Sequence, residues 1–350
     1  MSSSLTLREY RDGDEHAIQQ LYRTTFNRER PMDEWRWRFR QAPDGTALIL
    51  VVDDAGEIVG HNAHVGFRTF VDRSLVRAGH GGDTMVRADR QGQGVLRQIA
   101  EGFLAHPHGY DLRVGFPTDE AARLWSRYGG AVHLGHLQRW IRCAGASSMG
   151  RCAGAAVPHW FRPIVRATHG PAGLLGRLPT RGVTIEPLDP GSSEVDELAE
   201  RSAAFARCIR KRDSRYLAWR WFGQPGTDWS GLGARRRDGA LAGWVVFGRD
   251  DRRPKKFVTG YVVDLLVEDA ASMRLLLANA ASKLGAAGCE LIEFEFSDPR
   301  EWAQRACRRA GFLRRGEGNN FICKALTPEV GHLVEDLDNW FLTKGDSDLA

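Results

Sequence analysis

The alternation of hydrophobic and polar positions runs through the same order of elements twice. Leu5 to Leu7 shows a short strand pattern, and Glu15 to Phe26 follows with apolar residues at helical spacing. The same pair returns about 180 residues later, as Val183 to Ile185 and Glu194 to Phe205. Strands bury side chains at a period of two and helices at a period near 3.6, so both segments predict a strand followed by a surface helix.

Three further landmarks recur in the same order and at nearly the same spacing. They are the Trp pairs Trp35/Trp37 and Trp219/Trp221, the aspartates Asp83 and Asp264 within apolar strand runs, and the helical patterns Leu96 to Leu104 and Met273 to Leu284. Each half then closes with a strand, a short helix and a glycine. Four landmarks in one order predict an internal duplication.

Each copy predicts the order β-α-(α)-β-β-β-α-β-α-β, which is an α/β (α+β) fold with a mixed, twisted sheet and helices on both faces. The expected division is a first domain over residues 1–142 and a second over 182–326. Residues 143–181 are an expected linker with a bridging helix at Pro158 to Arg166, and 327–350 an expected C-terminal tail.

Composition fits this division. A chain of 350 residues is long enough for two domains, and 42% hydrophobic residues exclude a disordered protein. The longest apolar runs, such as Tyr261 to Val267, fall short of the roughly 20 residues that span a bilayer. We therefore expect a cytoplasmic protein without a membrane span or a leader segment.

Charge and cysteine content narrow the classes of ligand that the chain is expected to bind. The six cysteines form no CxxC pair, which predicts free thiols. A net charge of +5 suits an anionic ligand, but the arginines are spread along the chain. No nucleic acid partner is expected.

The most informative segment joins a strand to a helix. The strand ends at Val86, Gly92 and Gly94 follow one residue apart, and the helix begins near Val95. Glycines let the backbone turn tightly, and a helix N-terminus offers unpaired N–H groups, so this segment predicts an anion cradle. A plain tight turn is the alternative.

The segment resembles the coenzyme-binding motif of the GNAT acyltransferases, whose pattern is Arg/Gln-x-x-Gly-x-Gly/Ala. Here it is Gln91 to Leu96, with Leu96 in place of the last small residue. The flanking runs Gly81 to Val86, Gly115 to Thr118 and Gly129-Gly130 are similar to GNAT proteins of polysaccharide and secondary-metabolite clusters. The motif is present in the first copy alone.

The resemblance implies an acyl-CoA co-substrate, acetyl-CoA or a related one. The loop amides would hold its pyrophosphate, and the strand would pair with its pantetheine arm and polarise the thioester. The implied coenzyme-binding residues are Thr84, Met85, Val86, Gln91, Gly92, Gln93, Gly94, Val95 and Leu96.

Transfer to an amine needs a base. Asp83, beside the strand, is the first candidate, with His80, Asp119 and Glu120 as others. Asp264 holds the same place in the second copy, which leaves a structural role for Asp83 open.

The family's proton donor to the thiolate is a Tyr four residues before the closing glycine. Trp125 stands there, and Tyr128 is the nearest candidate. His61, His64, His106 and His108 have near-metal spacing but no acidic cluster, so no metal is expected.

The second copy lacks the glycine loop. Glu268 and Asp269 stand where a pyrophosphate would lie, so we expect no coenzyme binding there. Cys307, at the Tyr position, is a remote acyl-carrier candidate.

These features predict an N-acyltransferase, in particular an N-acetyltransferase, acting on the amine of a small molecule by direct attack. One alternative is an aminoacyl transferase of the peptidoglycan-bridge type that uses charged tRNA. The other is an acyl-CoA sensor without catalysis. The sequence favours no particular oligomeric state.

Overall fold

The computed structural model describes residues 5–105, 108–144, 182–250 and 257–347. The chain divides into two compact units. The first comprises residues 1–136, 224–226 and 319–337, and the second comprises 137–223, 227–318 and 338–350.

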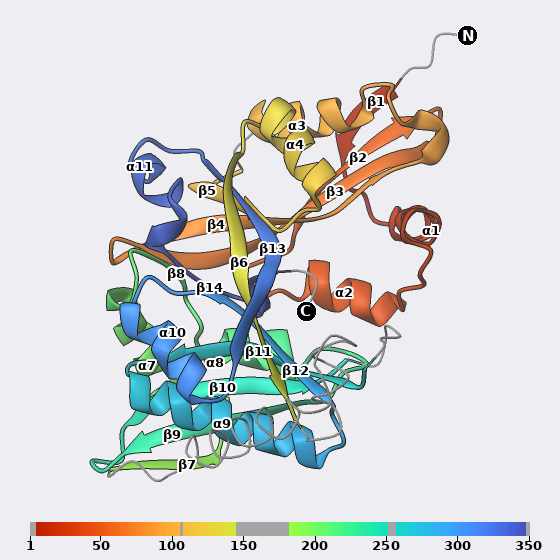
Figure 1. Cartoon of the computed structure of the whole chain (residues 1–350). Helices are drawn as coiled ribbons and strands as arrows, with labels where there is room; N and C mark the ends of the chain where they lie inside the picture. The colour runs from red at the N-terminus through yellow and green to blue at the C-terminus, as the bar shows by residue number, and fades with distance from the viewer. Residues whose placement is uncertain (1–4, 106–107, 145–181, 251–256, 348–350) are drawn as a thin grey trace. The chain divides into compact units, whose positions relative to one another are not determined.

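The first copy of the fold has the predicted order of elements (Figure 1). Its elements are β1 (Leu5–Glu9), α1 (Glu15–Phe26), α2 (Met32–Arg40), β2 (Leu48–Asp54), β3 (Glu57–Val71), β4 (Ser74–Val86), η1 (Ala88–Arg90), α3 (Val95–Ala105), β5 (Leu112–Gly115), α4 (Asp119–Gly129) and β6 (Val132–Cys143).

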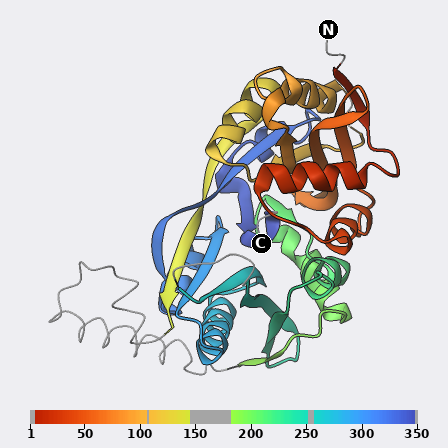
Figure 2. The same cartoon turned by 90° about the vertical axis from the view of Figure 1, so that its right-hand side faces the viewer.

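The sheet of the first unit has the strand order β1-β2-β3-β4-β5-β13, where β13 comes from late in the chain. The pairs from β1 to β4 are antiparallel, and β4 and β5 are parallel. Apolar residues of α3, including Ile99 and Phe103, pack on Val52 and Val59 of the sheet. Figure 2 shows α1, in red, across the opposite face.

The second copy repeats this order with additions at its end. Its elements are β7 (Val183–Pro187), α7 (Ser193–Arg201), η3 (Ser202–Ala204), β8 (Cys208–Arg210), α8 (Ser214–Leu217), the π-helical turn η4 (Ala218–Phe222), β9 (Trp229–Arg236), β10 (Leu241–Arg249), β11 (Thr259–Val267), α9 (Ala270–Ala286), β12 (Leu291–Ser297), α10 (Glu301–Arg309), β13 (Leu313–Ala325), α11 (Gly331–Val334), η5 (Leu337–Asn339), β14 (Trp340–Thr343) and η6 (Lys344–Asp346).

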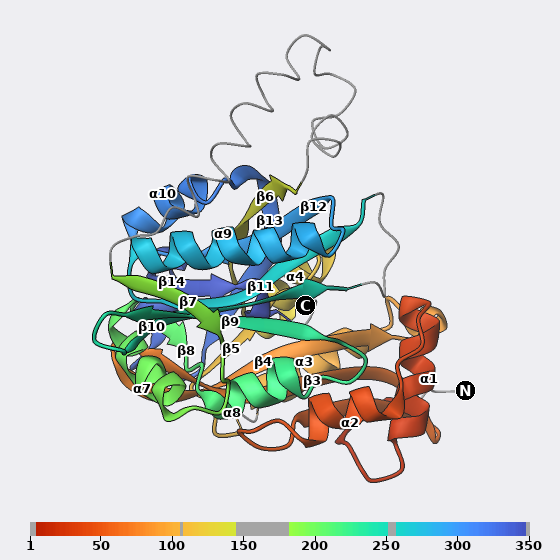
Figure 3. The ribbon, with the colours of Figure 1, turned by 90° about the horizontal axis from the view of Figure 1, so that it is seen from below.

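The sheet of the second unit has the order β6-β12-β11-β10-β9-β7, and β14 pairs with β12 and with β8. Figure 3 shows α9 and α10 on one face of this sheet and α7 and α8 on the other. The core is aromatic, with Trp140 stacked on Phe296 and Phe296 stacked on Phe294. The repeated order confirms the predicted tandem fold.

The last strand of each copy belongs to the sheet of the other unit. The end of β6, Gln138–Cys143, pairs antiparallel with β12, and the end of β13, Ile322–Ala325, pairs antiparallel with β5. The units are therefore not the contiguous segments 1–142 and 182–326 that we expected. An apolar strand pattern shows that a strand is buried but not which strand it pairs with, so the exchange left no signal in the sequence.

The expected tail and linker differ in what the structure describes. Residues 327–350, expected as a tail, contain α11, η5, β14 and η6. The expected bridging helix at Pro158 to Arg166 lies outside the described residues. None of the helices in the described parts of the chain is long and apolar enough to cross a membrane.

Candidate functional site

Two parallel strands separate in the middle of the first unit's sheet. β4 pairs with β5 from Ala78 to Gly81, where β5 ends at Gly115, while β4 continues to Val86. Among the described residues, no strand pairs with the edge of Gly82–Val86 that β5 leaves. An extended ligand can therefore form strand-like hydrogen bonds there. We call this opening the first fork.

A β-bulge lies at the first fork. The β3–β4 register shifts between His61 and Ala63, so that Asp83 and Thr84 both stand opposite Asn62. Asp83 takes the left-handed conformation, with φ 52°. Bulges bend a strand and separate it from its neighbour, which accounts for the divergence of β4 from β5.

Buried side chains of β3 hold the bulge. Asn62 donates from Nδ2 to the Gly82 carbonyl oxygen at 3.0 Å and to the Thr84 hydroxyl at 2.8 Å. His61 Nδ1 lies 2.8 Å from the Asp83 carbonyl oxygen. A carbonyl can only accept, so Nδ1 carries the proton. Burial lowers the pKa of His61 to about 4, and the ring is neutral at pH 7.

The glycine loop follows β4 after the short turn η1. Gly92 and Gly94 have φ of 74° and 84°, the region that only glycine adopts without strain, and a side chain at either position would meet no protein atom within 4 Å. Helix α3 begins at Val95, so its first N–H groups have no partner within the helix. The loop therefore joins two positive-φ glycines to a helix N-terminus.

Asp83, the first candidate base, is held in a buried ion pair. Its carboxylate accepts from Arg30, whose side chain is 1% exposed, and lies 3.4 Å from Arg38. Burial alone would raise the pKa of Asp83, but the charges of Arg38 and Arg30 outweigh it and lower the pKa to about 2. A carboxylate of such low basicity accepts a proton poorly.

His80 lies at the point where the first fork opens. It is on β4 next to Gly81, the last residue paired with β5. Its ring makes a T-shaped contact with the ring of Phe116, with 5.7 Å between the ring centroids. A side chain at Gly81 would face His64, which packs on Phe103 of α3. Since residues alternate along a strand, His80 points to the other face, where α1 packs.

The two aromatic residues near the end of α4 have different surroundings. The Trp125 indole donates to the Thr84 hydroxyl at 3.4 Å, which connects α4 with the bulge. Tyr128, the candidate proton donor, is half-buried, stacks against Arg127 and lies near Arg97 of α3, whose pKa is raised by Glu101 and to a smaller extent by Tyr128. Arg97 is in the first turn of α3, so Tyr128 lies toward the loop end of the site.

Asp119 and Glu120 open α4. Asp119 accepts from Asn320 Nδ2 at 2.7 Å, and the same amide group donates to the Pro117 carbonyl oxygen at 3.0 Å. Glu120 is exposed. Asp119 and Asn320 thus fix the turn that follows β5, on one side of the first fork.

The histidines of the described residues have separate partners. His61 is bonded to Asp83 and His64 is packed on Phe103, while His106 lies outside the described residues. Within the described ranges, no group of three or more His, Cys, Asp or Glu side chains could hold a metal ion.

The second copy uses its acidic residues internally. Asp269 caps α9 by accepting from the Ser272 N–H at 2.8 Å, and Glu268 is paired with Arg201 and Arg236. Cys307 is fully buried, and burial raises the pKa of its thiol well above the ordinary value, so it stays protonated.

Sequence analysis missed the arginines. Asp264, the counterpart of Asp83, is bonded to Arg212 at 3.0 Å, just as Asp83 is bonded to Arg30. Arg30 and Arg212 are themselves about 180 residues apart, between the first two helices of each copy. The duplicated Asp–Arg spacing was a signal that could have revealed the pair.

Comparisons with known proteins agree with this geometry. Residues 6–131 match the model of a GNAT acetyltransferase domain, and no curated protein matches the sequence. A probable N-acyltransferase from Enterococcus faecalis has a similar structure, with a TM-score of 0.64 and 8% identity over 93% of this chain and 73% of that one.

Two further structures share the fold. Saccharomyces cerevisiae N-myristoyltransferase with bound myristoyl-CoA has a TM-score of 0.59 and 11% identity over 93% of this chain and 80% of its own. A tandem GNAT protein of the clavulanic acid pathway has a TM-score of 0.56 and 15% identity, covering 93% and 99%. Residues 6–131 thus match a GNAT acetyltransferase domain, and the chain shares the fold of a tandem GNAT protein.

Proposed function

We propose that this protein is an N-acyltransferase that moves an acyl group from acyl-CoA, in the simplest case acetyl-CoA, to the amine of a small molecule. The donor would bind in the first fork. The observation that carries the proposal is that the open edge of Gly82–Val86 leads through the short turn η1 into the loop of Gly92 and Gly94. One linear ligand with an acyl-pantetheine arm and a pyrophosphate matches both parts.

The loop would hold the pyrophosphate through backbone N–H groups from Gln91 to Leu96 and the positive end of the α3 dipole. Arg87 and Arg90 keep nearby acidic groups engaged, Arg87 with Glu57 and Asp89, and Arg90 with Asp54. These ion pairs reduce the electrostatic repulsion between the neighbouring carboxylates and a bound phosphate.

The edge formed by Thr84, Met85 and Val86 would pair with the pantetheine arm. A fixed N–H on this edge can stabilise the oxyanion that forms when the amine attacks the thioester, an effect worth roughly 3 kcal/mol per donor. The C–N bond forms, the C–S bond breaks, and coenzyme A leaves as a thiolate.

The amine must release a proton, and His80 is the residue we assign to accept it. It stands at the opening of the first fork, whereas the Asp83 carboxylate is occupied by two arginines. The Thr84 hydroxyl accepts from both Asn62 and Trp125, so its own hydrogen points elsewhere and can form a hydrogen bond to the sulfur of the leaving thiolate. Tyr128 is the second candidate for that role.

Replacing Gly94 with Glu tests the site. Gly94→Glu places a carboxylate in open space at the loop, where the pyrophosphate would lie. We expect acetyl-CoA affinity in calorimetry to fall at least about a hundredfold, which corresponds to roughly 2.7 kcal/mol. Mass spectrometry of an amine panel incubated with acetyl-CoA should show acylated product for the unmodified protein and none for the variant.

The control is Gly239→Glu. Gly239 has φ 86°, close to the 84° of Gly94, and its neighbourhood is equally open, so both variants carry the same backbone strain and charge. Normal acetyl-CoA binding by a folded Gly94→Glu variant would refute the site. If the unmodified protein binds acetyl-CoA but acylates no amine, the transferase proposal is refuted and the acyl-CoA sensor remains.

A further inference from the structure

The second unit contains the same fork. β11 pairs with β12 from Thr259 to Val262, and the β10–β11 register shifts just beyond, between Val246 and Phe247. β12 continues to Ser297 without β11. We call this opening the second fork.

Strand β14 occupies the second fork. It pairs antiparallel with β12 at Phe296 and Ser297. The other edge of Phe296 is taken by Gln138 of β6, so β14 lies on the edge that β11 leaves. Trp340, Phe341 and Leu342 are each at most 2% exposed. In the second fork the chain itself therefore covers the edge of β12, the counterpart of β5.

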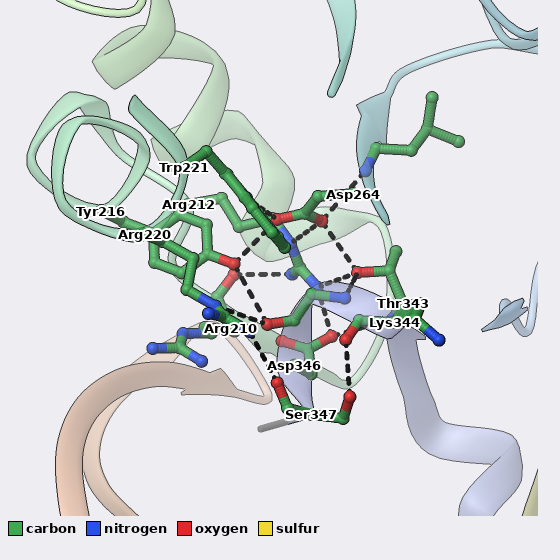
Figure 4. Close-up of polar contacts among 12 residues, drawn as sticks. Arg210, Arg212, Tyr216, Arg220, Trp221, Asp264, Thr343, Lys344, Asp346 and Ser347 are labelled. Atoms are coloured by element: carbon green, nitrogen blue, oxygen red, sulfur yellow. Dashed lines mark hydrogen bonds and ion pairs between the residues drawn. The ribbon is translucent and has the colours of Figure 1, made fainter. Parts of the chain in front are cut away.

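Asp264 binds this segment from β11 (Figure 4). Its carboxylate accepts from the Thr343 hydroxyl at 2.8 Å, and also from Arg212, Tyr216 and Trp221. Asp264 and Thr343 are fully buried. Asp83, the counterpart in the first copy, has arginine partners, and no strand of the described residues pairs with β4 beyond Gly81 on the side of β5.

The end of the segment is bound through its backbone and through Asp346. Arg220 donates to the carbonyl oxygens of Gly345 at 3.3 Å and Ser347 at 2.7 Å. Asp346 accepts from Arg212 and, at 2.8 Å, from the Thr343 N–H. A side chain at Gly345 would lie 2.8 Å from both Asp264 and Trp221, so only glycine fits there. These contacts are specific for a peptide.

The far end of the second fork is also filled by the protein. Asp269 already supplies the anion at the N-terminus of α9, the place where the first copy presents free N–H groups. A phosphate at this helix N-terminus would meet the Asp269 carboxylate.

We infer that residues 340–347 are a built-in peptide ligand of the second copy, bound in the second fork along β12, whereas the acyl donor would bind in the first fork along β4, the counterpart of β11. The comparison with an acyl donor rests on the proposed function, whereas the peptide groove itself rests on the contacts of Thr343, Gly345 and Asp346. The second copy is thus a peptide-binding groove saturated within the chain.

Cutting the chain after folding tests this inference. A protease site inserted between Glu335 and Asp336, both exposed, lets the intact protein fold before the segment is severed. We expect the severed segment to remain bound through gel filtration and to exchange with a labelled synthetic peptide of residues 340–347. Peptides with Thr343→Val or Asp346→Ala should bind at least tenfold more weakly, and a scrambled peptide should not bind.

Immediate loss of the severed segment with an unchanged melting curve would overturn the inference, as would equal binding of the scrambled peptide. Acetyl-CoA calorimetry on the protein freed of its segment should still give one site per chain, and a second site would also contradict it. If the uncut protein binds no acetyl-CoA, the proposed function fails while the peptide result stands.

Discussion

Asp83 and Asp264 occupy equivalent positions in the two copies, and each is neutralised by a buried arginine. The sequence placed Asp83 beside the strand of the motif, which made it the first candidate base. Its partners change that assignment, because a carboxylate between Arg30 and Arg38 is stabilised in its charged form. Duplication of the pair in a copy without the loop favours a structural role for both aspartates.

The ion pair of Asp83 should make stability depend on pH. The folded-state pKa is about 2, below the ordinary value of 3.8, so the stabilisation is complete above about pH 5 and is lost as the pH falls toward 2. The pH-dependent part amounts to about 2 kcal/mol.

We expect Asp83→Asn to remove this part, so that the urea unfolding free energies of variant and unmodified protein differ most near pH 7 and converge only as the pH approaches 2. Turnover per folded molecule should stay within a few-fold. A pH-independent stability difference would contradict the ion-pair account.

His80 gives the complementary prediction. An ammonium acceptor has a pKa near 10, so a base that removes its proton contributes on the order of 10²–10⁴-fold. His80→Gln should lower kcat at least tenfold while acetyl-CoA affinity in calorimetry is retained, and it should alter the acid limb of the pH–rate profile. A large kcat loss in Asp83→Asn together with normal turnover in His80→Gln would restore Asp83 as the base.

At the scale of residues, the sequence predicts those conformations that depend only on neighbours along the chain. Gly92 and Gly94 adopt the positive φ that their spacing suggested. The partners of Asp83 could not be deduced in the same way, because Arg30 is 53 positions away and reaches Asp83 through the packing of α1 and α2 on the sheet.

At the scale of elements, periodicity predicted most of both copies. The helix expected from Glu15 to Phe26 has those bounds, and both helices after the motif strands are present. Strand β14 was missed, because four buried residues in a polar neighbourhood carry no clear alternation. β14 is buried because it packs in the second fork, and its own sequence pattern does not indicate this.

Helix α9 provides a prediction at this scale. Asp269 caps it, so Asp269→Ala should lower the free energy of unfolding by about 1 kcal/mol, measured by urea denaturation. Acetyl-CoA affinity should not change, since the second copy has no donor site. Thr118→Ala, at the cap of α4 in the first copy, is the matched control for loss of a cap. A second acetyl-CoA site in Asp269→Ala would show that the carboxylate alone had blocked binding.

At the scale of the whole molecule, the exchange of the final strands could not be predicted from the sequence pattern. Each copy contains all elements of the fold in the same order along the chain, and this repeated order made the duplication visible in the sequence. The exchange of final strands depends on which edge each strand meets, and β6 and β13 have ordinary strand patterns wherever they pair. The boundaries of the units follow from pairing and not from composition.

The exchange predicts that the two halves depend on each other for folding. Residues 1–142 alone would leave β5 without β13, exposing an edge next to the buried Leu112 and Val114. Residues 143–350 alone would lack Trp140, which stacks on Phe296 in the core of the second unit. An unpaired edge strand and a missing core tryptophan each remove a large part of a domain's small net stability.

We therefore expect each fragment alone to show no cooperative thermal transition, and co-expression of the two to restore one transition together with acetyl-CoA binding. The matched control is a chain cut at Gly239, in the turn between β9 and β10 within the second unit, where no exchanged strand begins or ends. The contradicting result is clear. If residues 1–142 fold alone and bind acetyl-CoA, β6 has taken the place of β13 beside β5, and the exchange is a consequence of joining two self-sufficient domains and not a condition for their folding.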